Sequence, residues 1–280
     1  MAEEKKTHKK SKKKKRHIFR NIILFMIVFV LWFEIPVTEE IHIDDGGNEQ
    51  EQPARFALVT DLHSCYYGKN QKTLVKMLKK GKADAVLLSG DIFDNKFGDK
   101  NAKIFLEQIA DSYPCFYVAG NHEFWSDSMD EWKEYLRGIG VTVLEGNFET
   151  IEIKGKTYEI CGVDDPTYMS DDEWRAQLDG AYSGSDNYKI LLSHRPERVD
   201  FYDDYNFDLV VCGHAHGGQW INPFTGLGTL APDQGYWPKY VDGLYTLSNG
   251  TNMVVSRGLC RERMPYPRFF NHPEIVMIEI

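Results

Sequence analysis

Between residues 55 and 140 the chain alternates short apolar runs with longer amphipathic stretches. The apolar runs have the length of strands, and the amphipathic stretches carry apolar residues every three to four positions, as helices do. This alternation predicts a parallel sheet with helical crossovers. The predicted strands are Phe56–Thr60, Ala85–Ser89 and Cys115–Val118, and the predicted helices are Gln71–Lys80, Ala102–Asp111 and Met129–Gly138.

The second half of the chain contains more strand patterns and fewer helical ones. Apolar runs at Thr157–Gly162, Lys189–Ser193 and Leu209–Cys212 predict three more strands. In the last third, Leu244–Leu247, Met253–Ser256 and Glu274–Ile280 are separated by loops without a strong helical pattern, which predicts strands that complete a second sheet. A chain of 280 residues can bury about 75% of its extended surface, so one large α/β domain is expected without a disulfide framework.

The amino terminus has a different pattern, in which a lysine tract at Lys5–Arg16 precedes an unbroken apolar run at Ile22–Phe33. The run is shorter than the roughly 20 residues of a membrane span, but residues 18–37 reach that length if the polar residues within them lie at the interfaces. No small-residue cleavage site follows. We therefore expect an uncleaved transmembrane signal anchor over 18–37, and the alternative is a buried core helix behind a disordered basic tail.

This anchor would place the protein in the cell membrane as a single-pass protein. By the positive-inside rule, the basic tail, residues 1–17, would stay in the cytoplasm and everything after the anchor would lie outside. Residues 38–54 are acidic, contain Gly46-Gly47 and Pro53, and are expected to form a linker, although residues 41–43 could form a short edge strand. The main domain is expected to cover residues 55–280.

The charge distribution separates these parts. Residues 1–34 hold 10 Lys and Arg against 3 Asp and Glu, and the remaining residues hold 23 against 39, a net charge of −16. A domain with this charge repels long polyanions, so no nucleic acid partner is expected.

Five of the nine histidines follow predicted strands inside short motifs with Gly, Asp or Asn. Parallel strands bring such loops together at their carboxyl ends. The motifs are Asp61-Leu-His63, Gly90-Asp-Ile-Phe-Asp94, Gly120-Asn-His-Glu123, Ser193-His-Arg-Pro196 and Gly213-His-Ala-His-Gly-Gly218. The glycines before Asp91, Asn121 and His214 favour a sharp turn or a close backbone approach at these positions.

The residue types in these motifs indicate metal binding. In an extended segment, Asp-x-His and His-x-His place both side chains on one face, where they can bind one ion or straddle two. Carboxylate, imidazole and amide ligands together suit manganese, iron or zinc. Seven candidate ligands exceed the four to six of one ion, so two divalent ions are expected. The five cysteines lack C-x-x-C spacing and form neither a disulfide nor a zinc signature.

Taken together, these motifs resemble the calcineurin-like metallophosphoesterase superfamily, and in particular its membrane-anchored or exported bacterial branch of predicted phosphohydrolases. Besides the metal motifs, the resemblance includes Gly162-Val-Asp-Asp-Pro166, Leu191-Leu-Ser-His-Arg-Pro-Glu197, Val255-Ser-Arg-Gly258 and Arg268-Phe-Phe-Asn-His-Pro-Glu-Ile275. It implies two mixed β-sheets packed face to face with flanking helices, a four-layer αββα sandwich preceded here by the transmembrane helix. The pattern departs from the family at Cys260, where a glycine is expected.

The resemblance also implies the role of each site residue. Asp61, His63 and His216 would bind the first metal, Asn121, His194 and His214 the second, and Asp91 would bridge the two. His122 would contact the phosphate and help the leaving oxygen depart, and Asp94 would orient His122.

The implied activity is phosphoester hydrolysis by a hydroxide that bridges the two metals. The ions, Asp61, Asp91 and the hydroxide sum to +1, which leaves a positive centre for a phosphate within an acidic domain. The apolar segment from Trp220 to Leu230, with Tyr236 and Trp237, either forms a wall for a lipid or cell-envelope phosphate ester or simply covers the sheet. The alternative functions are a non-catalytic metal-binding scaffold and a nucleotide or nucleic-acid phosphodiesterase.

Overall fold

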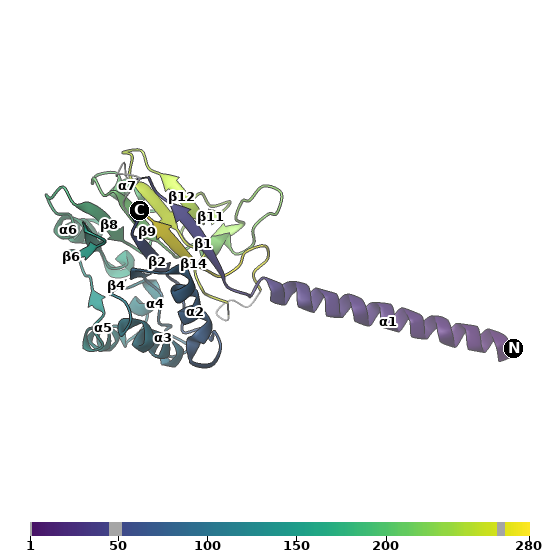
Figure 1. The fold of residues 1–280 in the computed structure, drawn as a ribbon. Coiled ribbons are helices and arrows are strands. Elements are labelled where there is room, and N and C mark those ends of the chain that lie inside the picture. The colour runs from purple at the N-terminus through teal and green to yellow at the C-terminus, as the bar shows by residue number, and fades with distance from the viewer. Residues whose placement is uncertain (1, 45–51, 262–266) are drawn as a thin grey trace.

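The computed structural model describes residues 2–44, 52–261 and 267–280, and side chains from residue 16 onward. The first element is helix α1 (Ala2–Trp32), which projects away from the rest of the chain (Figure 1). Two six-stranded sheets and the helices that cover them make up the remainder.

The first sheet has the strand order β1-β14-β2-β3-β4-β5. Strands β2 to β5 run parallel, β14 pairs with β2 in the antiparallel sense, and β1 pairs parallel with β14. Their bounds are β1 (Val37–His42), β2 (Arg55–Val59), β3 (Ala85–Ser89), β4 (Cys115–Val118), β5 (Thr142–Val143) and β14 (Glu274–Glu279).

The second sheet has the order β12-β13-β9-β8-β7-β6, with a parallel centre and antiparallel pairs at both edges. Its strands are β6 (Asn147–Ile153), β7 (Lys156–Gly162), β8 (Tyr188–Leu192), β9 (Leu209–Cys212), β12 (Gly243–Thr246) and β13 (Asn252–Val255). A separate two-stranded ribbon consists of β10 (Leu230–Ala231) and β11 (Gly235–Tyr236).

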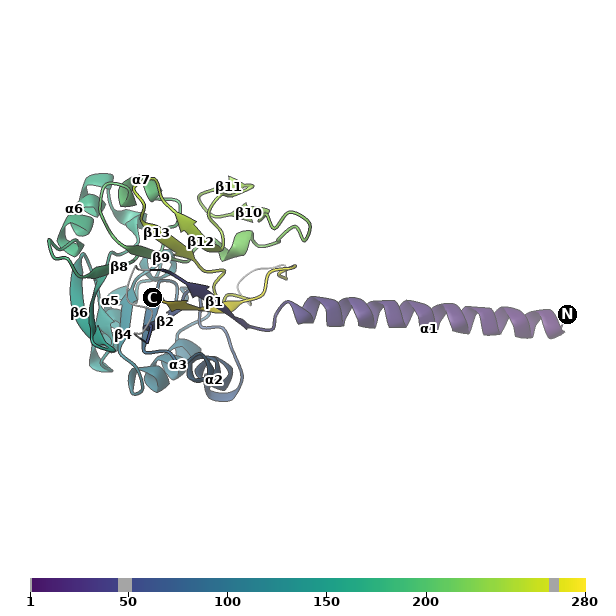
Figure 2. The same ribbon diagram turned by 45° about the horizontal axis from the view of Figure 1, so that its top comes forward.

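The two sheets pack face to face, and helices cover both outer faces, which gives four layers (Figures 1 and 2). In β2, Phe56 and Leu58 face the other sheet, while Ala57 and Val59 face the helices, so the strand is buried on both sides. Helices α2 (Lys72–Gly81), α3 (Lys100–Ala110) and α5 (Met129–Gly138) cover the first sheet, and α6 (Asp171–Ala181) and α7 (Val199–Tyr202) cover the second.

The predicted boundaries of the strands lie within two residues of the observed boundaries. One predicted strand belongs to a different sheet from the one expected. The last strand, β14, belongs to the first sheet and not to the second, because its apolar residues pack beside β2. The sequence pattern did not predict β5, β6 or α6. Helix α6 is marked by Ser170, whose side chain accepts from the Glu173 amide in a capping box.

The transmembrane anchor predicted over 18–37 is not supported. Within the described residues, no helix combines the length and apolar content needed to cross a membrane. Helix α1 ends at Trp32, and its apolar part from Ile18 spans about 22 Å, short of about 30 Å of hydrocarbon. The alternative of a buried core helix is also wrong, because most of these apolar side chains are exposed.

The predicted linker over 38–54 is interrupted by the sheet. Val37–His42 form β1 and pair along their whole length with β14. The sheet therefore begins before residue 55, the predicted start of the domain. Residues 45–51 of the predicted linker lie outside the described residues.

Candidate metal centre

The nine predicted site residues lie in the segments that directly follow β2, β3, β4, β8 and β9, where the carboxyl ends of strands from both sheets meet. The hydroxyl of Ser89, at the end of β3, lies 2.7 Å from the carbonyl oxygen of Ser193 and 2.9 Å from that of Val211. This contact ties the first sheet to the second directly beneath the site. Ser89 lies outside the polar motifs that predicted the site.

Asp91 is the centre of the cluster and is buried. Its Oδ2 lies 3.2 Å from His194 Nε2 and 3.6 Å from His63 Nε2. His194 Nδ1 lies 2.9 Å from the Ser89 carbonyl oxygen, and His63 Nδ1 lies 3.1 Å from Asp94 Oδ2. These contacts orient the rings so that the other nitrogen of each one points at Asp91, the arrangement common among histidine metal ligands.

Asp61 lies on the other side of the cluster. Its Oδ1 lies 3.9 Å from His194 Nε2 and 3.8 Å from His216 Nε2. The ring of His214 lies 5.0 Å from that of His194, centroid to centroid. Two of the candidate metal-holding groups in the structure are Asp61 with His63 and Asp91, and Asp91 with His194 and His214, each with ligand atoms within 4.8 Å of one another.

The backbone at the site is left-handed at five of the predicted ligands. Positive φ values occur at Asp61 (51°), His63 (46°), Asp91 (53°), His214 (67°) and His216 (48°). The prediction that Asp-x-His and His-x-His act as extended pairs is therefore wrong. Non-glycine residues rarely adopt this conformation, which costs of order 1–3 kcal/mol and persists where the surroundings enforce it, often at functional sites.

All three predicted glycines have no room for a side chain. A Cβ atom on Gly120 would lie 2.3 Å from Asp91 Oδ1, and one on Gly213 would lie 2.0 Å from Thr60 Oγ1 and 2.5 Å from Asp61 Oδ2. A Cβ atom on Gly90 would lie 2.6 Å from His194 Nδ1. The close backbone approach predicted at these positions is confirmed, and each glycine lets one loop pass directly against a side chain of another.

Glu123 organises two of the loops and was missed as a site residue. Its fully buried carboxylate accepts hydrogen bonds from the amides of Asp91, Ile92, Phe93 and Gly120, at 2.8–3.0 Å. Burial and the charge of Asp91 raise the pKa of Glu123 to about 8, although the backbone hydrogen bonds favour its ionised form. The only sequence signal was its place in the Gly-Asn-His-Glu motif.

The unsatisfied polar atoms of the site test whether these residues fit metal ions. Five predicted ligands carry a buried atom without a hydrogen-bond partner among the described residues: His63 Nε2, Asp91 Oδ2, Asn121 Oδ1, His194 Nε2 and His216 Nδ1. A buried polar atom without a partner costs about 1–3 kcal/mol, so such a group calls for a ligand. The nitrogen and oxygen set fits divalent transition metals.

The charges of the site residues also fit a divalent ion. Burial opposes ionisation of Asp91, but the His194 and His63 rings hold its pKa well below the usual value. For His194, burial favours the neutral ring, yet Asp91 raises its pKa to about 10. Without a metal, a protonated imidazole thus supplies the positive charge beside Asp91. A divalent ion can take over this role by displacing the proton.

His122 lies at the edge of the cluster, in α4 (Asn121–Phe124). Its ring packs between those of His63 and Trp125, with centroids 4.5 and 4.6 Å away. His122 Nδ1 lies 3.1 Å from Asn95 Oδ1 and 3.6 Å from Asp94 Oδ2. Asp94 lies closer to His63 than to His122, and Asn95, which the sequence analysis did not name, is the nearer partner of His122.

A second charged network holds His214. Its Nε2 lies 2.8 Å from Asp233 Oδ2 and 3.1 Å from a terminal guanidinium nitrogen of Arg195. Arg195 in turn donates to both carboxylate oxygens of Asp165, at 2.5 and 3.0 Å. The Arg195 and Asp165 positions belong to the Ser-His-Arg-Pro and Val-Asp-Asp-Pro motifs, but nothing in the sequence marked Asp233.

The apolar segment after His216 does not cover the sheet. Among its large side chains Phe224 is 95% exposed, and Leu227, Tyr236 and Trp237 are each more than half exposed. Trp220 packs edge-on against Phe269, with centroids 5.4 Å apart. These exposures contradict the alternative in which the side chains simply cover the sheet.

Comparison with known proteins agrees with this fold. The sequence profile of the calcineurin-like phosphoesterase family matches residues 54–218, more than half of the chain. The chain belongs to this family, and the resemblance inferred from its motifs is confirmed. Its membership of a membrane-anchored branch is not established by this match.

Individual relatives give the same result. An uncharacterized metallophosphoesterase of Helicobacter pylori is 29% identical over 236 residues, which cover 82% of this chain and 60% of the relative. The phosphodiesterase YaeI of Escherichia coli is 28% identical over 204 residues, 71% of each chain. The crystal structure of TT1561 of Thermus thermophilus shares the fold, with a TM-score of 0.52, 14% identity, and coverage of 74% of this chain and 90% of that one.

Proposed function

We propose that this protein is a hydrolase of phosphate esters that works with two divalent metal ions. The observation that carries the proposal is that five predicted ligands have a buried atom without a hydrogen-bond partner among the described residues, with those of His63 and His194 directed at Asp91 Oδ2. Family membership and the phosphoesterase relatives support the reaction class. Manganese, iron and zinc all suit the mixed nitrogen and oxygen ligands.

In this proposal Asp61, His63 and His216 hold the first ion, Asn121, His194 and His214 hold the second, and Asp91 lies between them. Two such ions lower the pKa of bound water and stabilise negative charge on the phosphate. The protein residues around them keep the imidazoles correctly oriented. Ser89 and Asp94 fix the rings of His194 and His63, and Asp233 fixes that of His214.

His122 is the proposed proton donor to the leaving oxygen. Its Nδ1 lies near the acceptor oxygens of Asn95 and Asp94 and keeps its own proton there, so the ring donates from Nε2 in its doubly protonated form and is left neutral afterwards. His122 is slightly exposed at the edge of the cluster, which lets it reach a bound ester. General-acid catalysis of this kind typically contributes about 10²–10⁴-fold in rate.

A lipid-bearing or cell-envelope phosphate ester is the proposed substrate class. The exposed side chains of Phe224, Leu227, Tyr236 and Trp237 support it, because they follow the His-x-His motif in the chain and offer apolar surface to an acyl chain. The test compares turnover of a phospholipid with that of a short-chain analogue carrying the same head group. Equal kcat/KM for both would remove the support for a lipid substrate.

Hydrolysis itself is tested with the full chain, since β1 lies before residue 55 and pairs with β14. Metal-stripped protein should be inactive on phosphate mono- and diesters and should regain activity with manganese. Asp91→Ala should abolish this activity while an exposed control on α5, Glu131→Gln, keeps it. Tight binding of metal without turnover of any ester would favour the scaffold alternative, and metal-dependent activity in the Asp91→Ala protein would contradict the proposal.

A further inference from the structure

Cys260 lies beside the proposed first metal, and we propose that its thiolate is a ligand of that ion. This inference rests on the proposed function and concerns the chemical identity of the first site. The site would then combine imidazole and carboxylate ligands with one sulfur. Such a set favours zinc over manganese, because thiolate is a soft ligand.

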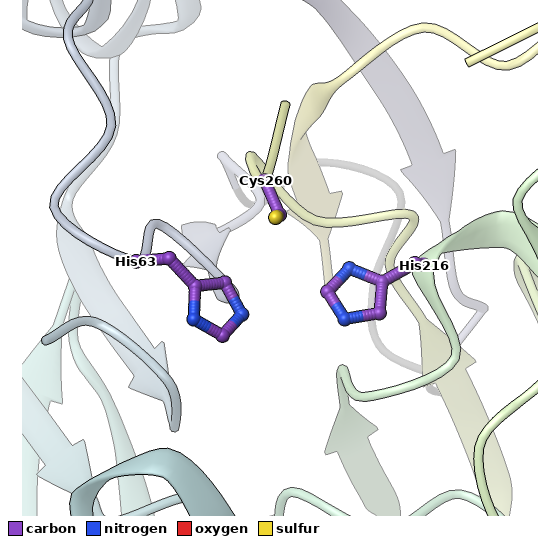
Figure 3. A group of neighbouring side chains, drawn as sticks. All are labelled: His63, His216 and Cys260. Carbon is purple, nitrogen blue, oxygen red and sulfur yellow. The ribbon is translucent and has the colours of Figure 1, made fainter. Parts of the chain in front are cut away.

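The three side chains form a compact group. His63, His216 and Cys260 are all buried, and each offers one ligand atom within 4.8 Å of the others. Figure 3 shows the two imidazoles facing each other across a gap, with the sulfur of Cys260 at its edge. In a tetrahedral zinc site, bonds of about 2.1 Å to nitrogen and about 2.3 Å to sulfur place two ligand atoms about 3.6 Å apart. Binding therefore requires these side chains to move together by at most about 1 Å.

The imidazole nitrogens provide the independent sign of a ligand. His63 Nε2 and His216 Nδ1 are buried and have no hydrogen-bond partner among the described residues. The other nitrogen of His63 is held by Asp94, so Nε2 is the atom left for an ion. His63 also belongs to the candidate metal group with Asp61 and Asp91.

The backbone around Cys260 is fixed against the metal centre. A Cβ atom on Gly258 would lie 2.6 Å from the Cβ of Asp61, so this segment touches the loop of a proposed ligand. The buried Arg268 donates from Nε to the carbonyl oxygen of Cys260 at 2.7 Å. The position of the thiol is thus determined by the fold on both sides of the residue.

A thiol gives up its proton when it coordinates a divalent ion, so the sulfur would bind as thiolate. The other four cysteines are buried as well, but none of them belongs to a candidate metal group among the described residues.

Cobalt substitution tests the inference without relying on turnover. Metal-stripped full-length protein is titrated with Co²⁺, and the near-ultraviolet thiolate-to-cobalt absorption is recorded for wild type, Cys260→Ser, Cys260→Gly and the control Cys115→Ser. We expect the band in wild type and in the control, and its loss in both Cys260 variants while cobalt remains bound. Cobalt bound by wild type without this band, or a band retained in Cys260→Ser, would overturn the inference and leave the proposed function standing.

Metal selectivity gives a second readout. Cys260→Ser should weaken zinc binding by about tenfold or more and change manganese binding much less, because only zinc gains strongly from sulfur. An equal loss for both metals would contradict a thiolate ligand. Failure of wild type to bind any divalent ion would refute the proposed function together with this inference.

Discussion

Replacing Gly120 with alanine tests how tightly the loops of the metal centre are packed. Residue 120 has a φ of −99°, which alanine adopts without strain, so the effect is purely one of space. The new Cβ would lie 2.3 Å from Asp91 Oδ1 and 2.6 Å from the Asp91 amide nitrogen. The contact must lengthen by about 1 Å to reach an ordinary separation, and a misplacement of that size can cost about a hundredfold in rate.

The stability cost is expected to be moderate. Overpacking by one methyl group typically costs about 1–3 kcal/mol, and the shifted loop also strains the hydrogen bond from the Gly120 amide to Glu123. Gly138→Ala is the matched control, because nothing lies within 4 Å of its missing Cβ and it occupies a helix. That change should stabilise the protein by about 0.5–1 kcal/mol.

Three measurements check this prediction: denaturant unfolding, metal stoichiometry and kcat/KM on a chromogenic diester. Gly120→Ala should retain its fold, lose metal affinity and lose about two orders of magnitude of activity. A Gly120→Ala protein with wild-type stoichiometry and activity within about threefold would show that the Asp91 loop yields easily, contrary to the packing argument.

Other perturbations address single interactions. His194 has a pKa of about 10 in the folded chain, against an ordinary value of 6.5. The stability that its pair with Asp91 gives the metal-free protein should therefore be complete below pH 6.5 and should fall as the pH rises toward 10. Urea unfolding at a series of pH values measures this change. Metal affinity should rise over the same pH range, with proton release seen by calorimetry; affinity that falls instead would contradict this. Asp233→Ala should weaken metal binding by about 10–100-fold with an unchanged unfolding midpoint, and unaltered affinity would mean that His214 needs no support. Lys133→Met removes the ammonium group that lies 2.7 Å from the buried Asp164 carboxylate. The free energy of unfolding should fall by about 3–5 kcal/mol, because a buried charge loses its partner. A loss below about 1 kcal/mol would show that water replaces the lysine.

Much of the architecture was predictable because local patterns and the tertiary fold agree. The apolar runs of β2, β3 and β4 are buried on both faces, so their boundaries stand out in the sequence. Edge elements were harder to predict. Strand β6 is largely exposed and polar, and β5 has only two residues, so neither carries a periodic signal.

The amino terminus shows the limit of composition as a guide. A basic tract before an apolar run predicted a membrane span, but the helix ends at Trp32 and Val37 begins a strand. Strand β1 pairs along its whole length with β14, which lies at the other end of the chain. Hydropathy of the local segment contains no information about that partner.

The sequence by itself indicated which loops meet at the candidate metal centre, because the order of polar motifs after apolar runs predicts which loops share one sheet edge. It also identified Gly120 and Gly213 as points of close approach. Only the tertiary structure decided how the ligands are held: the left-handed backbone at Asp61 and His63, the anchoring of two loops by Glu123, and the contacts of Asn95 and Asp233. These features depend on distances between residues far apart in the chain, which hydrophobic periodicity does not encode.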